Sequence, residues 1–300
     1  MKSNYRYIVK AFMAMAVIAG TTSCDDFLDR EPMSSISPET YYSTAAQLEA
    51  NLNDEYPNVL PSFGQWTYGI FGEDKGTDNQ IEVNANDRYT QDRWKVPHSE
   101  SDNWKFERIY RINFFLSEAL PKFGEDMSGS QNTISGSVAT IKHYIGEMYF
   151  LRAYEYFKKL QLFGDFPIIN QPLADEMEAL REASKRFPRN EVARFIISDL
   201  DKAYAYMSDV DMATTRINKD AAMLVKSRVA LFEATWLQNF KGTAFVPGGE
   251  GWPGASLHNN YQYPSGNLDN EVKYFLEQAV EASKLVADKY KGLSLIHISE

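Results

Sequence analysis

One region of the chain concentrates the side-chain types that bind sugars. Residues 66–94 are rich in Trp, Tyr, Asp, Asn and Arg, within a longer stretch, 54–101, that has no helical periodicity. A sugar presents apolar C–H faces, which stack on aromatic rings, and hydroxyl groups, which bond to Asp, Asn and Arg. So long an irregular stretch in a compact domain is usually functional. The predicted ligand-binding residues are Trp66, Tyr68, Asp74, Asp78, Asn79, Arg88 and Trp94, with Tyr89 and Arg93 beside them.

These aromatic residues have a second interpretation, in which Trp66 and Trp94 fold under the loop and pack on the scaffold. A secondary candidate cluster lies in a loop rich in Gly, Pro and Asn from about residue 242 to 267. It consists of Trp252, His258, Asn259, Asn260 and Tyr261. Three tyrosines, Tyr149, Tyr154 and Tyr156, are expected to pack between helices.

Metal and catalytic chemistry find little support. His143 and Glu147 are four residues apart on a predicted helix, but no third ligand is evident by spacing, so we interpret them as a surface pair. The glycine-rich segment 248–254 lacks the Lys-Ser/Thr of a phosphate-binding loop. Glu73 and Asp74 are adjacent carboxylates, but glycoside hydrolysis needs a defined separation across a bond. We therefore predict no catalytic residue, no metal and no cofactor.

The amino-acid composition and net charge limit the classes of protein to which this chain can belong. The 300 residues are 44% hydrophobic and carry a formal net charge of −10, which suits a large globular core and argues against a nucleic-acid binder. Cys24 is the single cysteine, so no disulfide within the chain can form.

The first 23 residues have the pattern of a secretory signal peptide. Lys2, Arg6 and Lys10 precede an apolar run at 11–19, and small residues follow at 20–23. The apolar run is too short to span a bilayer as a permanent helix. We expect these residues to be a targeting segment and the domain to begin at Cys24.

Cys24 at this junction resembles the lipobox of bacterial lipoproteins, in which the cysteine is acylated and becomes the mature N-terminus. Lipoboxes usually carry an aliphatic residue where this chain has Thr21, and an ordinary signal peptide is the alternative. The acids Asp25, Asp26 and Asp29 resemble the surface-export signal of Bacteroidota lipoproteins. The resemblance implies lipid attachment at Cys24 and an outer-membrane location facing the cell exterior.

The rest of the chain reads as helices joined by loops. We predict a helix from Ser37 as N-cap to about Leu52, then helices from near Asp102 and through about 141–160. Asn190 and Asn218 are predicted N-caps of two more, and a last helix covers about 269–290. Gly146 and Ala153 lie on one helical face, where small residues allow another helix to approach closely, and Gly164 is a predicted helix stop. Strand alternation is absent, so the pattern predicts a mostly α fold of tetratricopeptide-like helix pairs with long irregular insertions.

Five segments in order resemble the SusD/RagB family of surface nutrient-binding lipoproteins. The most specific is GEMYFLRAYEYFKKLQLFGDFPII at 146–169, which we assign to the scaffold. The others are CDDFLD at 24–29, WKFERIYRIN at 104–113, RNEVARFIISDLDKA at 189–203 and INKDAAMLVKSRVALFEATW at 217–236. The resemblance implies a helical, non-enzymatic protein that binds glycans, or in some cases peptides. It also implies a partner, a SusC-like TonB-dependent transporter that receives the ligand.

The tail at 293–300 resembles a translated sequencing adapter, and members of this family usually extend well beyond this length. We therefore expect a SusD-like domain over residues 24–292, incomplete at its C-terminus, with an apolar stripe of the last helix left uncovered. Two other functions remain open. One is a secreted helical glycosidase with Asp74 or Asp78 as catalyst, and the other is a tetratricopeptide adaptor that binds only protein.

Overall fold

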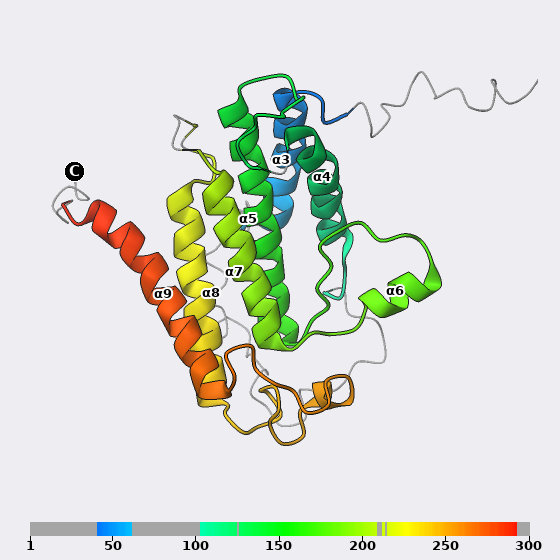
Figure 1. The fold of residues 1–300 in the computed structure, drawn as a ribbon, viewed down its shortest axis with the longest axis vertical. Coiled ribbons are helices and arrows are strands. Elements are labelled where there is room, and N and C mark those ends of the chain that lie inside the picture. The colour runs from blue at the N-terminus through cyan, green and yellow to red at the C-terminus, as the bar shows by residue number, and fades with distance from the viewer. Residues whose placement is uncertain (1–40, 62–102, 125, 209–211, 214, 293–300) are drawn as a thin grey trace, which may run out of the picture. The chain divides into compact units, whose positions relative to one another are not determined.

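The computed structural model describes residues 41–61, 103–124, 126–208, 212, 213 and 215–292. Within these ranges the chain forms seven α-helices, a short 3-10 helix and no strand, which confirms the mostly α prediction (Figure 1). The described residues from Tyr42 onward belong to one compact unit. The elements are α3 (Ala45–Val59), α4 (Glu107–Phe123), α5 (Val138–Phe163), α6 (Met177–Ala183), α7 (Arg189–Tyr206), α8 (Lys219–Asn239), η3 (Pro253–Ser256) and α9 (Leu268–Tyr290).

Helix α5 is the centre of this packing. It contacts α3 and α4 on one side and α7 on the other, and α7, α8 and α9 then follow in chain order, each packed on the one before (Figure 1). A helix with neighbours on several sides should be apolar around most of its circumference. The predicted inward stripe of α5 is buried throughout, at Ile141, Ile145, Met148, Arg152, Tyr156 and Leu160.

A glycine permits the close approach of α5 and α7. A Cβ atom added at Gly146 would lie 2.8 Å from the backbone nitrogen of Met207 and 3.0 Å from the carbonyl oxygen of Ala203. Both atoms are backbone, so neither can move aside without shifting α7. This confirms the prediction that the small-residue face of α5 receives another helix.

The start of the first described helix differs from the prediction. Thr44 is the N-cap of α3, in a capping box with Gln47, and residues 41–43 are not helical. The predicted cap Ser37 lies outside the described residues. The helix also continues past Leu52 to Val59, because buried residues recur at helical spacing up to its end.

The ends of α5, α7 and α8 agree with the sequence-based predictions at Asn218 and Gly164 and differ from them at Asn190. Asn218 caps α8 by accepting a hydrogen bond from the Ala221 backbone N–H, and Gly164 ends α5, both as predicted. Asn190 as the cap of α7 is wrong, because the N-cap is Pro188 and Asn190 lies buried in the first turn. Its amide instead bonds to side chains from the far end of the chain, as described below.

The predicted apolar stripe of α9 is not uncovered. Phe275, Ala279 and Val286 are buried, and α9 packs on α8. Other apolar side chains of this helix are exposed, namely Leu276, Val280, Leu285 and Tyr290. No helix in the described ranges is long and apolar enough to span a membrane.

Candidate functional site

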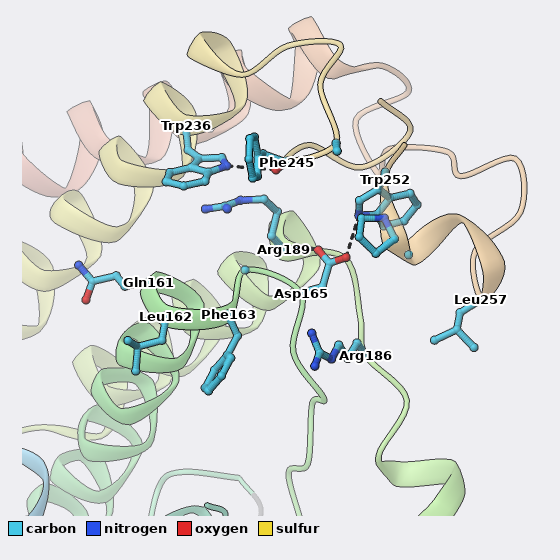
Figure 2. Close-up of a pocket in the computed structure, with 14 residues that line it drawn as sticks. Gln161, Leu162, Phe163, Asp165, Arg186, Arg189, Trp236, Phe245, Trp252 and Leu257 are labelled. Atoms are coloured by element: carbon cyan, nitrogen blue, oxygen red, sulfur yellow. Dashed lines mark hydrogen bonds between the residues drawn. The ribbon is translucent and has the colours of Figure 1, made fainter. Parts of the chain in front are cut away.

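A cavity of about 500 Å3 lies where the C-terminal ends of α5 and α8 meet the chain before α7 and the loop between α8 and α9 (Figure 2). This volume is in the range of small-molecule sites. We call the loop 240–267 the α8–α9 loop. The cavity is lined by Gln161, Leu162, Phe163, Gly164, Asp165, Arg186, Arg189, Trp236, Ala244, Phe245, Trp252, Pro253, Gly254 and Leu257.

The end of α5 sets the geometry of one wall. Gly164 has φ +68°, a left-handed conformation that favours glycine, and its N–H donates to the Leu160 carbonyl to close the helix. Two residues later Phe166 forms an isolated antiparallel bridge with Phe187. This bridge holds Asp165 and Arg186 on adjacent segments beside the start of α7.

Asp165 connects this wall to the α8–α9 loop. The indole Nε1 of Trp252 donates to Asp165 Oδ2 at 2.7 Å, and the backbone N–H of Arg189 donates to Oδ1 at 2.9 Å (Figure 2). Burial raises the pKa of the Asp165 carboxyl, and the two donors oppose this shift. The Asp165 carboxylate therefore holds the α8–α9 loop through Trp252 and also accepts the backbone N–H of Arg189 at the start of α7.

Arg189 forms a second link across the cavity floor. Its guanidinium is paired with the Glu233 carboxylate of α8, with Nε–Oε1 at 3.0 Å and Nη2–Oε2 at 2.9 Å. Both side chains are almost fully buried, and burial raises the pKa of Glu233 while Arg189 opposes the shift. The guanidinium also lies 4.1 Å from the ring centroid of Trp236. Nε and Nη2 of Arg189 are thus committed to Glu233.

The rim of the cavity is apolar and open to solvent. Phe245, Leu162 and Leu257 have relative exposures of 61%, 58% and 53%. Trp236 and Phe163 are partly buried between them, and the indole N–H of Trp236 donates to the Phe245 carbonyl at 3.1 Å. Exposed apolar side chains around a concave surface are typical of a binding site. The arrangement offers exposed apolar side chains, with the polar side chains of Gln161 and Arg186 also exposed in the lining.

Arg186 is the second cation of the lining. It is exposed, and its guanidinium lies 4.6 Å from the ring centroid of Trp104. Its carbonyl is 2.8 Å from Nε2 of His258, which ties the α8–α9 loop to the chain before α7. In Figure 2 the guanidinium lies between Phe163 and Asp165.

The far end of the α8–α9 loop is fastened by buried polar groups. Glu271 of α9 accepts hydrogen bonds from Asn190, from both Nε and Nη2 of Arg194 and from the Ser265 backbone N–H. Tyr261 exchanges hydrogen bonds with the Asn190 amide at 2.9 and 3.1 Å. Burial by itself would raise the pKa of Glu271, but these donors hold it below its ordinary value.

The first predicted binding cluster, Trp66 to Trp94, lies outside the described residues and stays a prediction, as does lipid attachment at Cys24. Of the second cluster, Trp252 lines the cavity and is 5% exposed. The ring centroids of His258 and Tyr261 lie 6.0 and 5.6 Å from the ring centroid of Trp252. Asn259 and Asn260 are exposed and do not line the cavity.

Sequence reasoning missed several lining residues, among them Asp165, Arg186, Arg189, Trp236 and Phe245. A signal was available, because Gly164-Asp165 lies within the 146–169 motif, directly after its helical part. That segment was assigned to the scaffold as a whole. The structure divides it, with the helix in the core and its exit at the cavity.

The interpretation of His143 and Glu147 as a surface pair is wrong. Both are buried, with Nε2 and Oε1 3.0 Å apart, because α5 is covered here by the chain before α8. His143 Nε2 also contacts the Ile217 carbonyl, and Nδ1 accepts the Ser208 N–H. Arg216 donates to both Glu147 oxygens. No group of three or more His, Cys, Asp or Glu side chains within the described ranges is arranged to hold a metal.

Comparison with known proteins places these features in a family. Residues 26–231, more than half of the chain, match a family model of SusD-like proteins described as starch-binding and associating with the outer membrane. The SusD-like proteins P25 and P2 of Formosa agariphila are each 25% identical, over 71% and 80% of this chain. The alignments cover 41% and 46% of those relatives, so the chain spans under half of their length.

Solved structures of similar proteins come from Bacteroides. A SusD-like protein of Bacteroides fragilis is 22% identical, with a TM-score of 0.49 over 71% of this chain and 39% of that one. A SusD-like carbohydrate binding protein of Bacteroides vulgatus is 14% identical, with a TM-score of 0.47 over 83% and 45%. By its match to the family model, this chain belongs to the SusD-like family.

Proposed function

We propose that the protein binds carbohydrate and that the cavity between α5, α8 and the α8–α9 loop contributes to the binding site. The main support for this proposal is the rim of the cavity, where Phe245, Leu162 and Leu257 are exposed. The volume of the cavity is in the range of small-molecule sites. Sugar rings would stack on this surface, and Gln161 and Arg186 supply hydrogen-bonding groups at its edge. The family description as starch-binding supports the same class of ligand.

Binding is favoured over hydrolysis by the chemistry of this lining. Glycoside hydrolysis generally uses two carboxyl groups on either side of the scissile bond. Among the described lining residues Asp165 is the one carboxylate, and both of its oxygens accept hydrogen bonds from Trp252 and Arg189. A carboxylate engaged in this way holds the loop and is poorly placed to exchange protons with a ligand.

Titration calorimetry of the purified chain against a panel of neutral and acidic oligosaccharides, with maltoheptaose among the neutral ones, would test the proposal. We expect Phe245→Ala to weaken binding by about tenfold or more, since it removes an exposed ring from the rim. Tyr110→Ala is the matched control, because Tyr110 is an aromatic residue of α4 that is 51% exposed and does not line the cavity. Equal affinity for both variants would exclude the cavity as the site, and no binding to any oligosaccharide would overturn the function.

We further propose that the protein is anchored to the outer membrane by a lipid on Cys24 and passes its ligand to a SusC-like TonB-dependent transporter. The sequence at 1–29 and the family description support this location. Mass spectrometry should find a diacylglyceryl group on Cys24, and Cys24→Ala should release the protein from membranes. Co-purification of the transporter with the anchored protein, but not with unrelated lipoproteins, would support the partnership.

A further inference from the structure

Arg186 differs from the other charged residues of the cavity in making no ion pair at contact distance, although its charge opposes the rise that burial causes in the pKa of Asp165. Arg189 is paired with Glu233, and Asp165 already accepts from Trp252 and Arg189. Within the part of the chain that the structure describes, no carboxylate oxygen lies within 4.0 Å of the Arg186 side chain. Its guanidinium therefore borders the cavity with its N–H donors available.

The surroundings of Arg186 limit the positions that its guanidinium can take. One face lies 4.6 Å from the ring of Trp104, which itself packs edge-on against Phe163 and Phe166 at 4.9 Å each. At the backbone, the bridge between Phe166 and Phe187 and the contact with His258 fix the segment that carries it. A guanidinium stacked on an aromatic ring is pre-organised, so less side-chain entropy is lost when it binds.

We propose that the ligand is an anionic saccharide and that Arg186 recognises its charged group. A planar guanidinium with free donors suits the bidentate geometry of a carboxylate or a sulfate ester. The neighbouring rings of Phe163 and Phe245 would hold the sugar face, as the proposed function requires, so this inference rests on carbohydrate binding at the cavity. It adds the class of sugar: a uronic acid or a sulfated sugar, in place of a neutral glucan.

The test compares pairs of ligands that share a sugar backbone and differ in the presence of the anionic group. Galacturonic acid oligosaccharides and their methyl esters share one sugar, and sulfated and desulfated galactan oligosaccharides form a second pair. We expect wild type to bind the charged member of at least one pair about tenfold or more tightly, with the preference weakening as salt rises. Arg186→Gln should remove that preference by weakening binding of the charged member about tenfold or more, with a smaller loss for the uncharged member. The pair that shows the effect distinguishes carboxylate from sulfate.

Arg181→Gln is the matched control, because Arg181 of α6 is exposed, is paired with Glu178 and does not line the cavity. It changes the net charge equally and should keep the preference. Equal binding of charged and uncharged members by wild type, or a preference that survives Arg186→Gln, would overturn the inference. In either case binding of the uncharged sugars would leave the proposed function standing, whereas absence of binding to every saccharide would remove both.

Discussion

The indole nitrogen of Trp252 lies 2.7 Å from Asp165 Oδ2, although 87 residues of chain separate the two. This hydrogen bond joins the α8–α9 loop to the exit of α5, and Phe245, Trp252 and Leu257 of the same loop line the cavity. The Asp165 carboxylate therefore contributes to the shape of the cavity.

Asp165→Asn should loosen the loop while the helices stay folded. An amide has one acceptor oxygen, so it cannot satisfy both Trp252 and the Arg189 N–H as the carboxylate does. Hydrogen exchange of residues 242–267 should quicken, and oligosaccharide affinity should fall. Asp175→Asn, at an exposed position outside the cavity lining, is the control and should change neither. Unchanged exchange in the loop would show that the bond does not hold it.

Breaking the ion pair of Arg189 and Glu233 should destabilise the whole domain. Arg189→Met leaves the Glu233 carboxylate buried without its partner, a change that typically costs about 3–5 kcal/mol. The double variant with Glu233→Leu removes both charges and should recover much of that loss. Urea denaturation measures both. Additive losses in the double variant would contradict a coupled pair.

Gly146→Ala should destabilise the packing of α5 on α7. The new methyl group would meet the backbone of Met207 and Ala203 at 2.8 and 3.0 Å, and overpacking of this kind costs about 1–3 kcal/mol. Gly292→Ala is the matched control, because an added Cβ there has no atom within 4 Å. If both variants unfold at the same urea concentration, the two helices can move apart freely.

Stability should fall in acid partly through Glu271. The pKa of its carboxyl is lowered in the folded protein by Arg194, Asn190 and Ser265, which outweigh the effect of burial. Its contribution is present above the pKa of an unfolded glutamate and is lost as the pH falls through the lowered value. Urea titrations from neutral pH to about pH 3 should show a shallower decline for Glu271→Gln than for wild type. Glu277→Gln, at an exposed position of the same helix, should keep the wild-type slope.

Helix content and the inward face of α5 could be predicted because they depend on local periodicity. Gly164 as a helix stop and Asn218 as a cap follow from local chemistry in the same way. Asn190 shows where this reasoning fails. Asparagine is a favoured N-cap residue, but the Asn190 side-chain amide is hydrogen-bonded to Tyr261 and Glu271, which are 71 and 81 residues away in the sequence. A tertiary partner outweighed the local preference.

The cavity could be predicted only in fragments for the same reason. Trp252 and His258 are close together in the sequence and so could be predicted as a cluster. Asp165 and Arg186 lie far from the loop in the sequence, and no sequence pattern predicts that they contact it. The exposed position predicted for His143 was wrong because helical spacing identifies a shared face and not its cover. Here the segment that covers His143 includes Ile217, 74 residues later in the chain, whose carbonyl contacts the His143 ring.

The α8–α9 loop is held by Asp165 on Trp252, by the Arg186 carbonyl on His258 and by Asn190 and Glu271 near its end. Between them, Pro253, Ser256 and Leu257 are exposed, as are Asn259 and Asn260. Substitutions at these exposed positions leave the holding contacts in place, because other residues make them. The surface around the cavity can therefore vary between lineages while the scaffold is inherited intact.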